Sequence, residues 1–221
     1  MFGLFQNNLF KISNNALDAL FPPACVSCRA SGFWLCEKCF ESIDFDVTAP
    51  SIMGVDQMYA LGSYANPVLR ALLTSYKYDS ASCLEPILKG LLEKWGESSN
   101  LHFEGAWTIV ATPTDARHIL ERGFDHTKFL ARIVRDLLLP NATIVGALER
   151  IRKTEANANL PEQEMRKGNI LGAIQLTESV KGNILLVDDV VTSGATMGEC
   201  ARILRATNIK RVEGFAFALG G

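Results

Sequence analysis

The chain has 221 residues, 48% of them hydrophobic, which suits one medium-sized domain with a small appendage. Its 22 basic and 24 acidic residues give a formal net charge of −2, so the chain as a whole is not a polycation that would hold nucleic acid. No apolar run approaches 18 residues, and residues 1–24 lack a basic segment followed by a long apolar one. We therefore expect a soluble, cytoplasmic protein with no membrane span. In a reducing compartment the six cysteines are not expected to form disulfides.

Residues 1–21 carry apolar side chains at roughly helical spacing, and Pro22 and Pro23 follow them. This pattern predicts an amphipathic helix that ends at the two prolines and packs on the rest of the protein. A membrane-surface anchor is the alternative interpretation. It is less favoured because Lys11 is the only basic residue of the stretch.

Four cysteines follow as two Cys-x-x-Cys pairs separated by seven residues: Cys25, Cys28, Cys36 and Cys39. Each pair places two thiolates on one tight turn, and two such turns can complete a tetrahedron around Zn²⁺ with S–metal distances of ~2.3 Å. Four protein ligands would close the site, so the zinc would be structural and would supply folding energy to a segment too short to bury a core. Two disulfides or an iron–sulfur cluster are the alternatives. The other two cysteines, Cys83 and Cys200, are expected to be buried.

A linker containing Pro50 is expected over residues 41–56, so we place a zinc-ribbon domain at 1–50 and a larger domain at 51–221. The larger domain begins with alternating apolar patterns. These patterns predict a strand over 57–63, a helix that ends at Lys77 and Tyr78, a second helix over 82–95, and a solvated loop over 97–100.

A short apolar strand over 107–111 leads into a loop that carries Arg117 and Arg122, and a helix is expected over 125–138. A pyrophosphate-binding loop needs this arrangement: backbone donors after a strand, together with an arginine. Loops that carry arginine are also commonly just solvated, so the local signal leaves both interpretations open.

A third strand is expected over 143–148, and a last one over 210–217. Between them, residues 149–169 show no apolar periodicity. A loop of this length in a compact domain is either functional or simply solvated. The functional interpretation is a lid that closes over a bound ligand and excludes water, and the alternative is a solvated loop without a role in binding.

The most informative stretch is 183–197. An apolar strand over 184–187 ends in Asp188 and Asp189, and the residues from Thr192 to Thr196 open a helix that continues to about residue 207. Free amide N–H groups, the helix dipole and the loop hydroxyls favour a phosphate, while Gly194 allows close backbone approach. The carboxylates would accept hydrogen bonds from ribose hydroxyls or hold a divalent cation.

Three other interpretations of the acidic strand fit less well. A Walker B strand would need an upstream Gly-x4-Gly-Lys-Ser/Thr motif, which the sequence lacks. A receiver-domain acidic pocket normally lies near the start of its domain. A purely structural turn rarely needs two consecutive acids followed by Thr-Ser-Gly-Ala-Thr.

Residues 184–196 resemble the signature of type I phosphoribosyltransferases, which bind 5-phosphoribosyl-1-pyrophosphate (PRPP). With the cysteine quartet ahead of this motif, the chain from about Leu20 to Ala218 resembles the ComF/GntX family, in which a double zinc ribbon precedes a phosphoribosyltransferase domain. The resemblance also rests on the segment 72–78 with Lys77, on Pro113 with 122–124, and on Arg166 and Asn169.

The resemblance implies an α/β fold: a type I phosphoribosyltransferase-like parallel sheet flanked by helices, with a small N-terminal zinc ribbon. It implies that Asp188 and Asp189 form the catalytic centre and hold the ribose hydroxyls. The implied PRPP and phosphate ligands also include Thr192, Ser193, Gly194, Ala195, Thr196, Lys77, Arg117 and Arg122. Structural Zn²⁺ on the four cysteines and Mg²⁺ carried with PRPP are the implied cofactors.

The chain departs from the family pattern in two places. Asp125 and His126 stand where the family usually has Asn-Gln, and in the long loop Asn157 stands where the family usually has Gln, with one extra residue before Arg166. Two functions are therefore considered. The first is a ComF-like protein that binds PRPP or ribose 5-phosphate and acts in DNA uptake during natural transformation. The second is an active phosphoribosyltransferase that moves ribose 5-phosphate to a nitrogenous acceptor and releases pyrophosphate.

The expected partners follow from these two functions. PRPP or a related nucleotide is the small-molecule partner. Single-stranded DNA or competence-machinery proteins would meet the zinc ribbon and the basic residues of 117–135 and 150–153. Beside the cysteine cluster, Phe33 and Trp34 offer stacking surfaces for bases, or they pack in the core.

Overall fold

The structure is a computed structural model that describes residues 22–45, 47–78, 81–99, 101–152 and 170–220. The helix expected over 1–21 lies outside these residues. So does most of the long loop, including Asn157, Arg166 and Asn169. Across the described ranges, no helix combines the length and the apolar character needed to cross a membrane.

A five-stranded sheet forms the centre of the molecule, in the order β1-β7-β6-β2-β3, and every neighbouring pair is parallel. Its strands are β1 (Gln57–Ser63), β2 (Trp107–Ala111), β3 (Thr143–Ile144), β6 (Asn183–Val191) and β7 (Val212–Leu219). Because helices cover both faces, β2 and most of β6 are continuous apolar runs. The central position of β6 places the acidic pair in the middle of the sheet.

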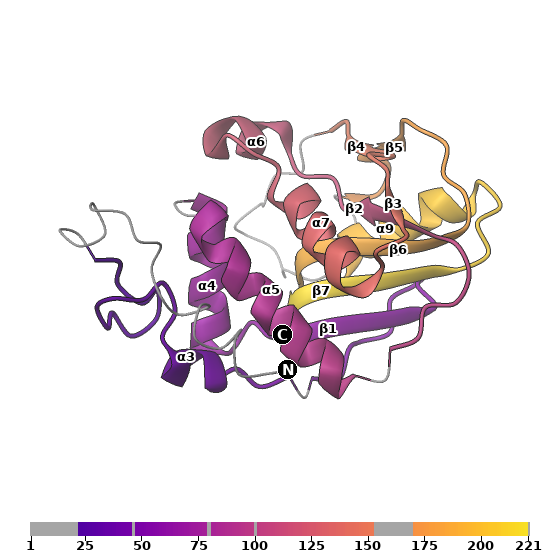
Figure 1. The fold of residues 1–221 in the computed structure, drawn as a ribbon. Coiled ribbons are helices and arrows are strands. Elements are labelled where there is room, and N and C mark those ends of the chain that lie inside the picture. The colour runs from indigo at the N-terminus through magenta and orange to yellow at the C-terminus, as the bar shows by residue number, and fades with distance from the viewer. Residues whose placement is uncertain (1–21, 46, 79–80, 100, 153–169, 221) are drawn as a thin grey trace.

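Helices cover the two faces of the sheet unequally (Figure 1). One face carries α4 (Pro67–Tyr78), α5 (Ala81–Ser98) and α7 (His126–Leu138), and the other carries α9 (Ala195–Arg205). Side chains of β6 alternate between them: Leu185 and Val187 pack with the first group, Ile184 and Leu186 with the second. The predicted fold class, a parallel sheet flanked by helices, is confirmed.

Four short elements complete the described chain: α3 (Glu37–Glu41), α6 (Ala116–Arg122), β4 (Leu148–Arg150) and β5 (Ile174–Leu176). The single strand predicted over 143–148 is wrong, because β3 stays in the main sheet while β4 pairs antiparallel with β5 in a separate two-stranded sheet. The solvated loop predicted from residue 97 is also wrong at its start, since α5 continues to Ser98. Helix α6 has no buried residue, so no apolar periodicity predicts it.

The cysteine segment packs directly on the sheet domain. Leu35, Cys39 and Phe40 belong to the same hydrophobic core as the buried residues of α4 and α5. The Lys94 ammonium of α5 lies 2.5 Å from the Glu41 carboxylate and 5.3 Å from the centre of the Phe40 ring. The division into two domains at residue 50 stays a prediction.

The N-terminus of α4 is tied to this segment as well. The Asn66 side-chain amide donates to the Ser42 carbonyl at 3.0 Å, while its oxygen accepts from the N–H groups of Val68 and Leu69. Helix α4 therefore begins at the cysteine segment, and it ends beside the acidic pair described below. Of the two remaining cysteines, Cys200 is buried as expected, whereas Cys83 is exposed, so that part of the prediction is wrong.

Candidate functional site

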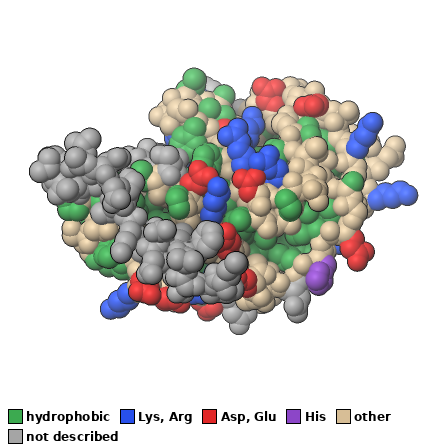
Figure 2. Space-filling view, in the orientation of Figure 1, with side chains coloured by type: hydrophobic (Ala, Val, Ile, Leu, Met, Phe, Trp, Pro, Cys, Tyr) green, Lys and Arg blue, Asp and Glu red, His purple; other side chains and the backbone are tan. Residues whose placement is uncertain are grey.

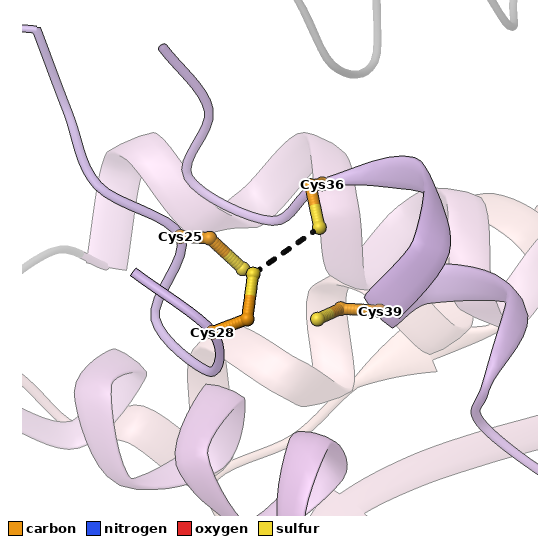
Figure 3. A group of neighbouring side chains, drawn as sticks. All are labelled: Cys25, Cys28, Cys36 and Cys39. Carbon is orange, nitrogen blue, oxygen red and sulfur yellow. Dashed lines mark hydrogen bonds between the residues drawn. The ribbon is translucent and has the colours of Figure 1, made fainter. Parts of the chain in front are cut away.

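The four cysteines of the quartet point toward one another (Figure 3). Their sulfur atoms all lie within 4.8 Å of one another, and the sulfurs of Cys28 and Cys36 are 3.5 Å apart. Cys25 and Cys28 lie at either end of a turn, whereas Cys36 is the N-cap of α3 and Cys39 lies within that helix. The second pair therefore sits on a helix N-terminus instead of a second tight turn.

This geometry fits a tetrahedral zinc ion. With Zn–S bonds of about 2.3 Å, the sulfurs of a Cys₄ site are spaced by roughly 3.8 Å. Burial alone would raise the pKa of the Cys25 thiol. Hydrogen bonds from the N–H groups of Cys36, Cys28 and Ser27 outweigh this effect and bring the pKa down from 9.0 to about 6. Backbone amides that stabilise a thiolate are the outer-shell partners expected around structural zinc. The quartet is thus placed to hold a structural zinc ion.

Strand β6 runs through the acidic pair instead of ending before it. Val190 and Val191 still pair with Ala218 and Leu219 of β7, so the expected end of the strand at residue 187 is wrong. On the other side, the pairing with β2 stops at Val187, which also accepts from the N–H of Thr112 at 2.9 Å. Asp188 and Asp189 therefore lie where β2 has ended and its following loop diverges, which is where ligands collect in parallel sheets.

Asp189 is the more deeply buried acid, with 7% of its surface exposed. Its Oδ2 forms an ion pair with the Lys77 ammonium at the end of α4 and lies 3.7 Å from His126 Nε2 at the start of α7. Burial alone would raise the pKa of this carboxyl, but Lys77 and His126 lower it below its ordinary value. Asp189 is accordingly ionised and already engaged by protein groups.

Asp188 has a different environment. It is half-buried, and its Oδ1 accepts from the N–H of Asp189 at 2.9 Å. Burial, followed by the neighbouring Asp189 charge, raises the pKa of Asp188 to about 8. The two consecutive acids therefore differ: Asp189 is held ionised by its cation, and Asp188 retains a proton near neutral pH.

The loop after β6 leads directly into α9. Gly194, the N-cap residue, has φ +70°, and no side chain caps the helix there. Thr192 is exposed, whereas Ser193, Ala195 and Thr196 are partly exposed. An uncapped N-terminus of an 11-residue helix presents N–H groups and the positive end of the dipole toward a bound anion.

Of the two arginines considered for the site, Arg122 is joined to the acidic strand. Its Nη1 lies 3.1 Å from His126 Nδ1, and the other nitrogen of that ring faces Asp189. Arg117 instead forms two side-chain hydrogen bonds with the Asp115 carboxylate, the N-cap of α6, and those bonds lower the pKa of Asp115 to about 2. These contacts connect Lys77 directly with Asp189, and Arg122 through His126.

The connecting residue, His126, was not singled out as a site residue from the sequence. The only signal was its departure from the family pattern at 125–126. It is 5% exposed, and its carbonyl oxygen lies 3.4 Å from the Tyr76 hydroxyl of α4. The chain Arg122–His126–Asp189–Lys77 thus joins α6, α7, β6 and α4.

Basic and acidic side chains also gather side by side at the molecular surface. Figure 2 shows Lys and Arg side chains beside Asp and Glu side chains near the middle of this face, with apolar side chains next to them. Among the described residues, the cysteine quartet is the only group of three or more His, Cys, Asp or Glu side chains placed to hold a metal ion.

Together these features define an α/β protein with a parallel sheet, a mixed-charge site at the central strand, and a cysteine cluster suited to structural zinc. No protein-family model matches the chain. The chain is 24% identical over 170 residues to "Competence protein F" of Haemophilus influenzae, and this alignment covers 74% of this chain and 72% of that protein. It is 26% identical over 212 residues to "DNA utilization protein YhgH" of Escherichia coli K12, and this alignment covers 83% of this chain and 91% of that protein.

The relative of the same name in Salmonella typhi is 33% identical over 97 residues, which span 43% of this chain and 42% of that protein. The similarity thus extends over most of the chain and includes relatives with both names. The resemblance to the ComF/GntX family predicted from the sequence is confirmed.

Proposed function

We propose that the chain binds a phosphorylated ribose, PRPP or a related nucleotide, at the carboxyl-end region of β6. In this proposal the ribose hydroxyls meet Asp188 and Asp189. The 5-phosphate meets the loop from Thr192 to Thr196 and the N-terminus of α9. Lys77 and Arg122 supply positive charge toward a diphosphate, and Arg117 would have to leave Asp115 to join them.

One observation carries the proposal: an acidic pair at the middle of a parallel sheet is followed at once by an uncapped helix N-terminus whose N-cap is a glycine with φ +70°. Hydroxyl donors suit the carboxylates, and a phosphate suits the helix end. A ligand that carries both groups at the spacing of a ribose 5-phosphate satisfies both neighbours. Mg²⁺ would arrive with the diphosphate, which carries its own oxygen ligands for that ion.

Transfer of the ribosyl group is the second candidate function. An acceptor nitrogen would attack C1 of the ribose, the C1–O bond would break, and pyrophosphate would leave with the electron pair while the nitrogen loses a proton. The positively charged Arg122 and Lys77 near the acidic pair favour this function, because they would stabilise the departing pyrophosphate. Release of pyrophosphate on addition of nucleobases tests it directly.

Calorimetric titration of the zinc-loaded protein with Mg²⁺·PRPP tests sugar-phosphate binding. Asp188→Asn is the informative variant, because Asp188 is half-buried and carries no ion pair with a cation among the described contacts. Asp136→Asn is the matched control, since that carboxylate is exposed on α7 and bonds to Arg135. Binding by the wild type and by the control is expected, with roughly two- to tenfold weaker binding by Asp188→Asn. The amide keeps only one of the two oxygens that would meet the ribose hydroxyls, and a lost neutral hydrogen bond costs about 0.5–1.5 kcal/mol. No binding by the wild type would refute the proposal.

We further propose that the chain takes part in the handling of DNA during uptake. This rests on relatives named for competence and for DNA utilization that align with most of the chain. Single-stranded DNA or a competence-machinery protein would contact the cysteine segment and the basic residues around β4. Arg150 is the last residue of β4, and the Arg152 guanidinium donates a hydrogen bond to the Leu171 carbonyl. Lys153 lies outside the described residues.

Transformation frequency in the natural host tests this role. Replacement of the gene by a Cys36→Ser variant is expected to lower the frequency, while Cys83→Ser, an exposed cysteine outside the cluster, is the control.

For DNA contact, an Arg150→Ala, Arg152→Ala, Lys153→Ala triple variant is compared with the wild type in single-stranded DNA binding at low salt. Electrostatic contacts weaken steeply with salt, so the loss should be largest there. Equal binding by both proteins would exclude this surface as the DNA contact.

A further inference from the structure

A buried histidine lies between Arg122 and the acidic strand. His126 is 5% exposed and lies at the first position of α7. Its two ring nitrogens face different partners: Nδ1 lies 3.1 Å from Arg122 Nη1, and Nε2 lies 3.7 Å from Asp189 Oδ2. The side chain therefore lies between the end of α6 and the acidic strand.

The chemistry of the two partners determines the tautomer. A guanidinium can only donate, so Nδ1 must accept from Arg122 and cannot carry a proton. In a neutral ring the proton then resides on Nε2, which faces the Asp189 carboxylate. Arg122 is thus held by an acceptor on the protein, and Asp189 is approached by an N–H donor in addition to the Lys77 ammonium.

The charges around the ring keep it neutral. Burial is the main cause that lowers the pKa of His126, to about 4. Asp189 on β6 and Asp125 at the start of α7 raise this pKa, while Lys77 on α4 and Arg122 on α6 lower it. The ring is uncharged throughout the physiological range, so Nδ1 stays an acceptor for Arg122 and Nε2 stays protonated as the pH changes there.

We propose that His126 is a positioning residue of the sugar-phosphate site: its Nδ1 holds Arg122 through a hydrogen bond, and its Nε2 faces Asp189 Oδ2 at 3.7 Å, close enough for an electrostatic contact. This role rests on the proposed function for its effect on ligand binding, but the position of the ring between Arg122 and Asp189 does not itself depend on a ligand. It assigns a task to one of the two residues at which the chain departs from the family pattern. Glutamine, which has one acceptor and one donor group, would reproduce either contact of the ring.

Two variants separate positioning from mere space filling. His126→Leu keeps an apolar side chain in the buried space and removes both polar contacts, so affinity for Mg²⁺·PRPP should fall about 10- to 100-fold. His126→Gln retains an acceptor or a donor and should stay within about threefold of the wild type. The matched control is His118→Gln on α6, an exposed histidine that contacts Glu121 and should bind as the wild type does.

A second measurement needs no ligand. Long-range ¹H–¹⁵N spectra of the imidazole rings should show an unprotonated Nδ1 and a protonated Nε2 for His126, unchanged between about pH 5.5 and pH 8, whereas an exposed histidine titrates there. A protonated Nδ1 or an imidazolium in that range would overturn the proposal. So would equal affinities of the Leu and Gln variants, whether both match the wild type or both are weakened. If the wild type does not bind Mg²⁺·PRPP, the proposed function fails, while the spectra still decide the role of His126 in the arrangement.

Discussion

Substitution of Lys77 by methionine tests whether the ion pair at the end of α4 holds the acidic strand. The Lys77 side chain is 21% exposed and the Asp189 side chain 9%, so the pair is largely removed from water. Methionine keeps the length of the stem but leaves the Asp189 carboxylate without its cation. Breaking a buried pair in this way costs about 3–5 kcal/mol. Because Lys77 retains some contact with solvent and His126 remains near Asp189, we expect roughly 2–3 kcal/mol.

The dependence on pH provides a second check. Lys77 and His126 lower the pKa of Asp189 in the folded state, so its contribution to stability is present above the unfolded pKa of about 3.9 and is lost as the pH falls through the lower folded value. Without Lys77, burial is opposed only by His126 and the backbone, and the Asp189 pKa should rise. The free-energy difference between the variant and the wild type should therefore be largest near neutral pH and should shrink as acid protonates Asp189 in the variant.

Urea unfolding followed by far-UV circular dichroism, near neutral and at mildly acidic pH, measures both effects. Lys89→Met is the matched control, because Lys89 lies on α5 in a more exposed pair with Glu85 and its loss should change stability by only about 0.2–0.5 kcal/mol. A Lys77→Met, Asp189→Asn double variant should recover part of the loss, since no unpaired charge is then left buried. A cost for Lys77→Met no larger than that of Lys89→Met would refute the reasoning.

Three further predictions concern the other parts of the protein. Cys39→Ser, compared with Cys83→Ser, should abolish stoichiometric zinc binding in a colorimetric release assay and lower the melting temperature, because Cys39 is in both the sulfur cluster and the main core; equal zinc content in both variants would contradict this. The Asp188 pKa is about 8 in the folded state and 3.8 when unfolded, so wild-type stability should fall as the pH rises between these values. The melting temperature of Asp188→Asn should not show this fall with pH; if it shows the same fall as the wild type, the assignment of the proton to Asp188 is wrong. Gly194→Ala should destabilise by about 1–3 kcal/mol in urea, since φ is +70° and the new Cβ would lie 2.9 Å from Ile52, and it should exceed Gly123→Ala, where φ is +77° but the space is open; a larger effect at Gly123 would argue against the contact.

Local patterns were sufficient for much of the fold. The strands over 57–63 and 107–111 have the predicted bounds. Apolar runs of this length between turn signals favour strands, since helices are usually longer. Strand β6 was predicted too short, since hydropathy ends at Val187 while the pairing with β7 continues to Val191. The segment over 143–148 divides between two sheets, and no periodicity in six residues could indicate which sheet each half would join.

The site shows the same division. Two Cys-x-x-Cys pairs predict a metal cluster because each pair is local, and the short connection between them lets the pairs meet. Asp188, Asp189 and the helix after them are likewise contiguous. Lys77 and His126, by contrast, reach Asp189 only because α4 and α7 pack on the same face of the sheet. Spacing along the chain can place groups on one turn, but an ion pair between residues 77 and 189 depends on how those helices bury their apolar sides, which the tertiary structure alone decides.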